Sequence, residues 1–119
     1  MARLKLPDPL SRRHLLEGRL DEAKALALAR AYLEVEREVE AIDFLSAAGG
    51  ADNEEAAGLL RELQASALSR GDVFLMKSAS RALGEEPANA TWRALADAAA
   101  ASGRSRDAEA AARLATVGE

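Results

Sequence analysis

Apolar residues recur along this chain at intervals of three and four, the spacing of one face of an α-helix. The clearest stripe keeps to steps of four, three, four and three, through Leu28, Tyr32, Val35, Val39 and Ile42. No segment of the sequence alternates with the period of two that a half-buried strand requires. The pattern therefore predicts an all-α protein, with helices near 9–17, 21–35, 38–48, 53–70, 72–83, 89–101 and 105–117.

Residues that start and stop helices agree with these ranges. Asp8 precedes Pro9, which predicts an N-cap followed by a proline in the first turn, and Gly18 ends that short helix. Asp52-Asn53-Glu54-Glu55 has the D-x-x-E form of a capping box, so another helix begins there. Gly49-Gly50 closes the helix before it. Later boundaries are marked by Gly71-Asp72, by 84–87 and by Ser102-Gly103.

The helices fall into pairs around turns at Glu36, Gly71 and Gly103, which lie 35 and 32 residues apart. Each pair has one apolar stripe, which the next pair can cover by stacking. We expect small residues to allow close contact between helices, and these are Ala29, Ala41, Ala96 and Ala108. We expect large residues to fill the space between the helices, and these are Tyr32, Leu45, Leu63, Met76 and Trp92. The prediction is one domain over 1–119, with a capping helix at 8–20 and hairpins at 21–50, 52–87 and 88–117.

These repeats resemble the tetratricopeptide repeat family over residues 22–116, best in WRALADAAAASGRSRDAEA and also in AYLEVEREVEAIDFLSAA. The chain departs from the family pattern at Glu36, where a turn glycine is expected, and at Ser80 and Ala112, where an aromatic residue is expected. The resemblance implies an array of antiparallel helix hairpins, an α-α superhelix. It also implies that the first helix of each pair lines a groove for a peptide or a partner helix.

A second architecture stays open at this stage. No glycine or proline interrupts residues 21–48, so the apolar stripe there could belong to one long helix, packed in a bundle or paired with a second chain.

The amino-acid composition excludes several classes of chemistry and of binding partner. Alanine, the strongest helix former, supplies 29 positions. There is no cysteine, which excludes disulfides, cysteine-ligated metals and thiol catalysis. The net charge of −4 is spread along the chain and favours neither nucleic acid nor an anionic membrane as a partner. The N-terminus has no apolar run typical of a signal peptide, so the expectation is a soluble cytoplasmic protein.

His14 is the one candidate for chemistry. HLLEG, residues 14–18, resembles the H-x-L-K-G run of histidine phosphotransfer domains, which implies a phosphoryl acceptor in a four-helix bundle. Glu17 stands where that run has a basic residue, and its carboxylate would repel the incoming anion. A single histidine allows no histidine-pair metal site, and no nucleophile elbow or phosphate-binding loop is present. The sequence therefore predicts no enzyme, no cofactor and no metal, with a phosphotransfer-like signalling bundle as the alternative.

Binding of a protein or peptide partner is the leading prediction. The family register assigns to the groove Leu26, Arg30 and Leu33, then Arg61, Ala65 and Leu68, then Arg93, Asp97 and Ala100. From these we expect a partner-binding set of Arg30, Leu33, Arg61, Leu68, Arg93 and Asp97. The three arginines would meet an acidic or carboxylate-bearing partner. In the alternative, Arg30 pairs with Glu34 and Arg93 with Asp97, four residues on along the same helix.

Self-association is a second expectation. The face formed by Ala108, Ala111 and Ala115 would lie bare at the end of the array, which predicts a homodimer in which another chain covers it.

Overall fold

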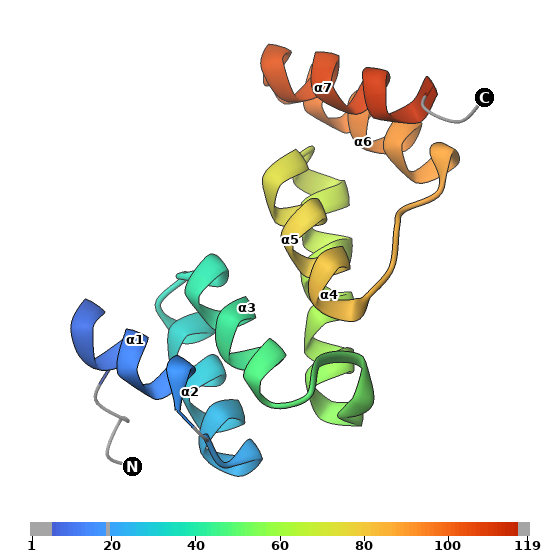
Figure 1. The fold of residues 1–119 in the computed structure, drawn as a ribbon. Helices are drawn as coiled ribbons and strands as arrows, with labels where there is room; N and C mark the ends of the chain where they lie inside the picture. The colour runs from blue at the N-terminus through green and yellow to red at the C-terminus, as the bar shows by residue number, and fades with distance from the viewer. Residues whose placement is uncertain (1–5, 19, 117–119) are drawn as a thin grey trace. The chain divides into compact units, whose positions relative to one another are not determined.

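Helices make up every regular element that the structure describes (Figure 1). The structure is a computed structural model, and it describes residues 6–18 and 20–116. The elements in chain order are α1 (Pro9–Glu17), α2 (Glu22–Glu34), α3 (Glu38–Ala47), the 3₁₀ turn η1 (Gly50–Asp52), α4 (Glu54–Arg70), α5 (Val73–Leu83), α6 (Asn89–Ala101) and α7 (Ser105–Thr116). The all-α prediction is confirmed, and the predicted helix ranges agree with the observed ones to within one residue over the described residues.

The capping residue of one helix was assigned wrongly. Asn53, and not Asp52, caps α4, because its Oδ1 accepts the N–H of Ala56 at 3.1 Å. The 3₁₀ turn η1 is the physical reason. It carries the chain one residue further before α4 begins, and the N–H of Asp52 donates to the carbonyl oxygen of Gly49 at 2.9 Å. The predicted cap at Asp8 is confirmed, since its Oδ1 accepts the N–H of Ser11 at 2.8 Å.

A single helix over 21–48 is ruled out, because the chain reverses at Glu36. The φ angle of Glu36 is 60°, in the left-handed region. The N–H of Glu36 donates to the carbonyl oxygen of Leu33 at 3.1 Å, and that of Arg37 donates to the carbonyl oxygen of Tyr32 at 2.9 Å. These two bonds close α2 and turn the chain into α3.

The same turn recurs at Gly71 and Gly103, with φ angles of 69° and 75°. The N–H of Gly71 donates to the carbonyl oxygen of Leu68 at 3.3 Å, and that of Gly103 donates to the carbonyl oxygen of Ala100 at 3.1 Å. In each case the N–H of the next residue donates five positions back, as in a Schellman C-cap. Three predicted reversals are thus built by one hydrogen-bonding pattern, and α2–α3, α4–α5 and α6–α7 are antiparallel hairpins (Figure 1).

Contacts group the chain into two compact units, residues 1–60 and 61–119, and the boundary falls inside α4. In the first unit α2 packs on α3, and the rings of Tyr32 and Phe44 stack with their centroids 5.4 Å apart. The guanidinium carbon of Arg37 lies 5.1 Å from the centre of the Tyr32 ring, on its face. The core of this unit therefore combines an aromatic pair with buried aliphatic residues, among which Ala29 and Ala41 are fully buried.

The second unit is held together by α5, α6, α7 and the C-terminal part of α4. Its core holds the predicted large residues Leu63, Met76 and Trp92. In α7, Ala111 and Ala115 are buried where that helix packs on α6, and Ala108 is half-buried. The expectation of a bare alanine face is wrong, because the face that α7 leaves exposed is its polar side, including Glu109 and Arg113.

None of the helices over residues 6–18 and 20–116 combines the length and the apolar character that crossing a bilayer demands.

Candidate partner-binding surface

One face of α4 carries the predicted groove residues of the middle hairpin into a shared hollow. The hollow measures about 330 Å³ and belongs to the second unit. Arg61, Gln64, Ala65 and Leu68 line it from α4, at the helical spacing of three, four and seven residues. Thr91 of α6, Met76 of α5 and the segment 85–88 complete the wall. We call this hollow the α4 groove.

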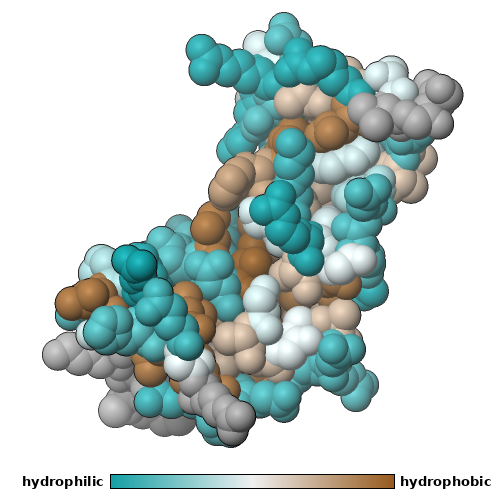
Figure 2. Space-filling model, viewed as in Figure 1, coloured by the Kyte–Doolittle hydropathy of each residue, from teal (hydrophilic) through white to brown (hydrophobic). Residues whose placement is uncertain are grey.

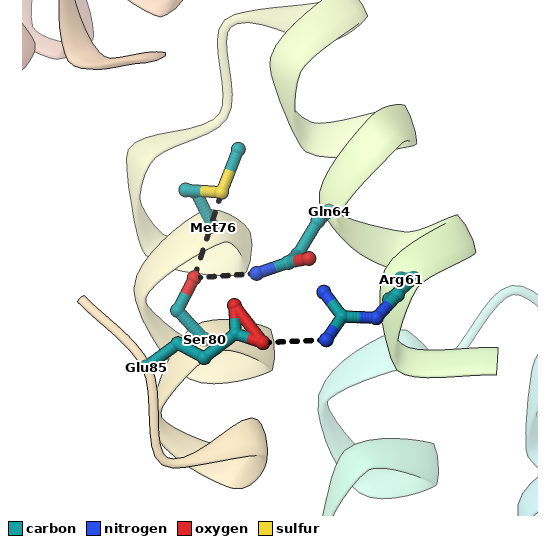
Figure 3. Close-up of polar contacts among 5 residues, drawn as sticks. All are labelled: Arg61, Gln64, Met76, Ser80 and Glu85. Atoms are coloured by element: carbon teal, nitrogen blue, oxygen red, sulfur yellow. Dashed lines mark hydrogen bonds and ion pairs between the residues drawn. The ribbon is translucent and has the colours of Figure 1, made fainter. Parts of the chain in front are cut away.

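Two separate sets of polar contacts involve side chains of this groove (Figure 3). An Nη of Arg61 lies 2.7 Å from a carboxylate oxygen of Glu85, in the segment between α5 and α6. Gln64 donates through Nε2 to the hydroxyl oxygen of Ser80 at 3.0 Å, and that hydroxyl faces the sulfur of Met76 at 3.6 Å. Ser80 is buried, so its hydroxyl depends on these partners. The second set positions the Gln64 amide along α4, whereas the Arg61 guanidinium is held by an exposed ion pair.

Arg30 makes the corresponding connection in the first unit. Its guanidinium pairs with the carboxylate of Glu55, in the first turn of α4, and not with Glu34 as the sequence alternative proposed. Arg30 and Arg61 thus each pair with an acidic residue 25 or 24 positions later, beyond the next helix of the chain. Both pairs are about half exposed, so each contributes at most about 1 kcal/mol to stability.

The other predicted site residues lie in different environments. Leu68 and Leu33 are half-buried, Ala100, Arg93 and Asp97 are exposed, and neither Arg93 nor Asp97 lines the α4 groove. Leu26, which the register assigned to the groove, is buried in the core with only 9% of its surface exposed. Its assignment to an open groove was wrong, because Leu26 belongs to the buried apolar face of α2. Of the residues that the family register assigned to the groove, the structure brings together Arg61, Ala65 and Leu68.

Two features of the groove were missed by the sequence reading. Gln64 lies one turn after Arg61 on the same helix face, so helical spacing alone could have identified it. The segment 85–88 and Thr91 could not have been found in this way. The positions of these residues in space depend on the path of the chain between the end of α5, at the C-cap Gly84, and the start of α6 at Asn89.

His14 lies exposed in the last turn of the short helix α1, which packs on α3. Its neighbour Glu17 pairs with Arg13 at 2.8 Å. A phosphoryl group on His14 would therefore stand at the negative end of a helix dipole, beside a carboxylate. The phosphotransfer interpretation stays a prediction, which mass spectrometry for an adduct on His14 after incubation with a phosphodonor would test.

Charged residues surround the contact of α1 with α3. Burial raises the pKa of Asp43, although the charge of Arg12 opposes this effect. A hydrogen bond from its own backbone N–H, assisted by Arg37, lowers the pKa of Glu40. Hydrogen bonding from the backbone N–H of Ser11 lowers the pKa of the N-cap Asp8. These shifts follow from helix capping and packing, and none of the three groups lines the α4 groove.

Nowhere in the described ranges do three or more histidine, aspartate or glutamate side chains gather so that they could hold a metal ion. Comparison of the whole chain with models of protein families, with curated proteins and with solved structures gave no match.

Proposed function

We propose that this chain is a non-enzymatic, tetratricopeptide-like interaction module that binds an extended or helical segment of a partner protein in the α4 groove. The observation that carries the proposal is the grouping of Arg61, Ala65 and Leu68, with Gln64 and Thr91, around one hollow. Three hairpins with the same turn support the likeness to helical repeats.

The chemistry of the groove favours a partner segment with a carboxylate beside an apolar side chain. Arg61 offers a guanidinium that can bind a carboxylate through two parallel hydrogen bonds. Leu68 offers apolar surface, and the Gln64 amide can hydrogen-bond a peptide backbone. Glu85 already holds Arg61, so an incoming carboxylate must compete with Glu85 for it. Because both side chains of this pair are well exposed, the competition costs little free energy.

Affinity capture from a cell lysate, with mass spectrometry of the retained proteins, tests the proposal when a groove variant is compared with a matched control. The groove variant is Arg61→Ala/Ala65→Glu, and the control is Arg113→Ala/Ala112→Glu on the exposed side of α7. Both variants change the net charge by the same amount and replace exposed residues. A partner of the groove is retained by the parent chain and by the control, and is lost from the groove variant.

Retention of the same proteins by both variants would contradict the proposal. The wider hypothesis, in which Arg30 and Arg93 also face the partner, predicts that the triple replacement Arg30→Ala/Arg61→Ala/Arg93→Ala abolishes capture while helicity is unchanged.

Self-association remains part of the proposal as a homodimer, although the alanine face of α7 no longer supports it. Sedimentation at several concentrations tests it directly.

A further inference from the structure

A second and larger hollow of the second unit has a different chemistry. It measures about 530 Å³ and shares the segment 85–87 with the α4 groove, but its other walls come from α5, α6 and α7. Trp92 and Leu114 contribute its apolar lining, and Lys77 and Arg81 of α5 contribute its positive charge. Outside the segment 85–87 no residue lines both hollows, so a ligand of this hollow would meet a different set of side chains from a ligand of the α4 groove.

The positive charge is available to a ligand. Lys77 and Arg81 lie one turn apart on α5 and are both exposed. Neither side chain makes an ion pair with residues in the described ranges. Two acidic residues, Glu85 and Glu86, also line the hollow. Glu85 forms an ion pair with Arg61, so Glu86 is the acid whose negative charge opposes the positive charges of Lys77 and Arg81.

An exposed aromatic residue extends this surface along α5. Phe74 lies three residues before Lys77 and seven before Arg81, on the same side of the helix, and 64% of its surface is exposed. Figure 2 shows hydrophobic patches lying between hydrophilic residues on one face of the protein. Among the described residues, Phe74 is the exposed aromatic side chain in a group of large hydrophobic residues whose other members are aliphatic. We call Phe74, Lys77 and Arg81 the α5 ridge.

We infer that the α5 ridge and its hollow bind an acidic segment of a partner protein. A large apolar side chain of that segment enters the hollow beside Trp92 and Leu114, and its carboxylates meet Lys77 and Arg81. A buried apolar anchor with charged contacts at the rim is the usual division of roles at protein interfaces. Opposite charge would also speed association and make it sensitive to salt.

Charge argues against a nucleic acid or an anionic membrane at this place. The second unit contains eight arginine and lysine residues and eight aspartate and glutamate residues, so it has no net charge. Binding to a phosphate backbone or to anionic lipids relies on many cations acting together. Two cations beside an apolar hollow fit a short acidic peptide better.

Trp92 makes the test direct, because it is the one tryptophan of the chain and lines the hollow. Random twelve-residue peptides without tryptophan, displayed on phage, are selected on the full chain. They are then counter-selected against Phe74→Ala/Lys77→Glu/Arg81→Glu. We expect the surviving peptides to carry several aspartate or glutamate residues around a large apolar residue. They should change the emission of Trp92, and their affinity for the variant should fall at least roughly tenfold.

Two controls keep the outcome decisive. Arg106→Glu/Arg113→Glu reverses two exposed charges of α7 and should leave peptide binding unchanged. Amide NMR spectra of both variants establish that they are folded.

The inference is overturned if no selected peptide depends on the α5 ridge, or if the selected peptides are not acidic. It is also overturned if they leave the Trp92 emission unchanged. Tighter binding of single-stranded DNA or of vesicles containing anionic lipid would overturn it as well. So would concentration-dependent self-association that the ridge variant abolishes, because the occupant would then be a second copy of the chain.

Discussion

Gly71 lies directly against the backbone of Ala99. A Cβ atom added to Gly71 would come within 2.3 Å of the Cα of Ala99 and 2.4 Å of its backbone nitrogen. The turn between α4 and α5 therefore touches α6 at a point where no side chain fits. This contact explains why one hairpin of the second unit can pack closely on the next.

We expect Gly71→Ala to destabilise the protein much more than Gly103→Ala. Both glycines have left-handed backbone, so alanine costs about 1 kcal/mol of strain at either position. At Gly103 no atom lies within 4 Å of the added Cβ, whereas at Gly71 α6 must move, which adds roughly 1–3 kcal/mol. Urea unfolding of the two variants measures the difference. Equal losses of stability would show that the Gly71–Ala99 contact is unimportant.

Glu36→Gly should stabilise the protein by about 1 kcal/mol, because glycine adopts the left-handed backbone of this turn without a Cβ penalty. Glu34→Gly provides the matched control. Glu34 is the last residue of α2, and glycine there should cost about 0.5–1 kcal/mol. Thermal unfolding of both variants should therefore give changes of opposite sign. A destabilised Glu36→Gly protein would mean that the Glu36 side chain has a contact worth more than the strain.

Ser80 and Gln64 should be energetically coupled. Ser80→Ala removes the acceptor of the Gln64 amide and should cost about 1 kcal/mol, and Gln64→Leu should cost a similar amount. The double variant should lose less than the sum of the two, by roughly 0.5–1 kcal/mol, because no polar group is left without its partner. A double-mutant cycle by urea unfolding measures this coupling. Strict additivity would show that the hydrogen bond contributes nothing.

Two carboxylates of α3 should affect the pH dependence of stability with opposite sign. The pKa of Glu40 is lowered in the folded protein from its ordinary value of 4.5, so the ionised group stabilises the fold above that pH. This contribution is lost as the pH falls through the lowered pKa. Glu40→Gln should therefore be less stable than the parent protein at pH 7, and the difference should vanish in acid.

The pKa of Asp43 is raised from its ordinary value of 3.8, so its ionisation opposes folding. Asp43→Asn should be more stable than the parent at pH 7. The gain should fall as the pH drops below the raised pKa, and should disappear below 3.8. Urea unfolding between pH 3 and pH 7 measures both variants, and a change of the same sign for the two would contradict the cited shifts.

The helices could be predicted from the sequence because their signals are local. Asp8, Gly49 and Gly84 mark helix ends through the chemistry of single residues, and apolar spacing identifies the buried faces. Glu36 shows the limit of this method. It makes the same left-handed turn as Gly71 without being a glycine, so the sequence left a single long helix open there.

Pairings between distant residues could not be predicted. The i+4 rule offered Glu34 as the alternative partner of Arg30, but the fold brings Glu55 within reach of its guanidinium. The α4 groove was predicted at Arg61, Ala65 and Leu68, which belong to one helix face. The residues that complete it depend on the course of the segment 84–88, for which the sequence offers no periodic signal.

Amide NMR titration with the binding segment of a captured partner tests the central claim most directly. If the chain is a helix-hairpin module that binds through its α4 groove, the largest shift changes will fall on Arg61, Gln64, Leu68 and Thr91. They will be absent from the same titration of Arg61→Ala/Ala65→Glu. Changes centred on α1 around His14, or changes that persist in the groove variant, would contradict the account.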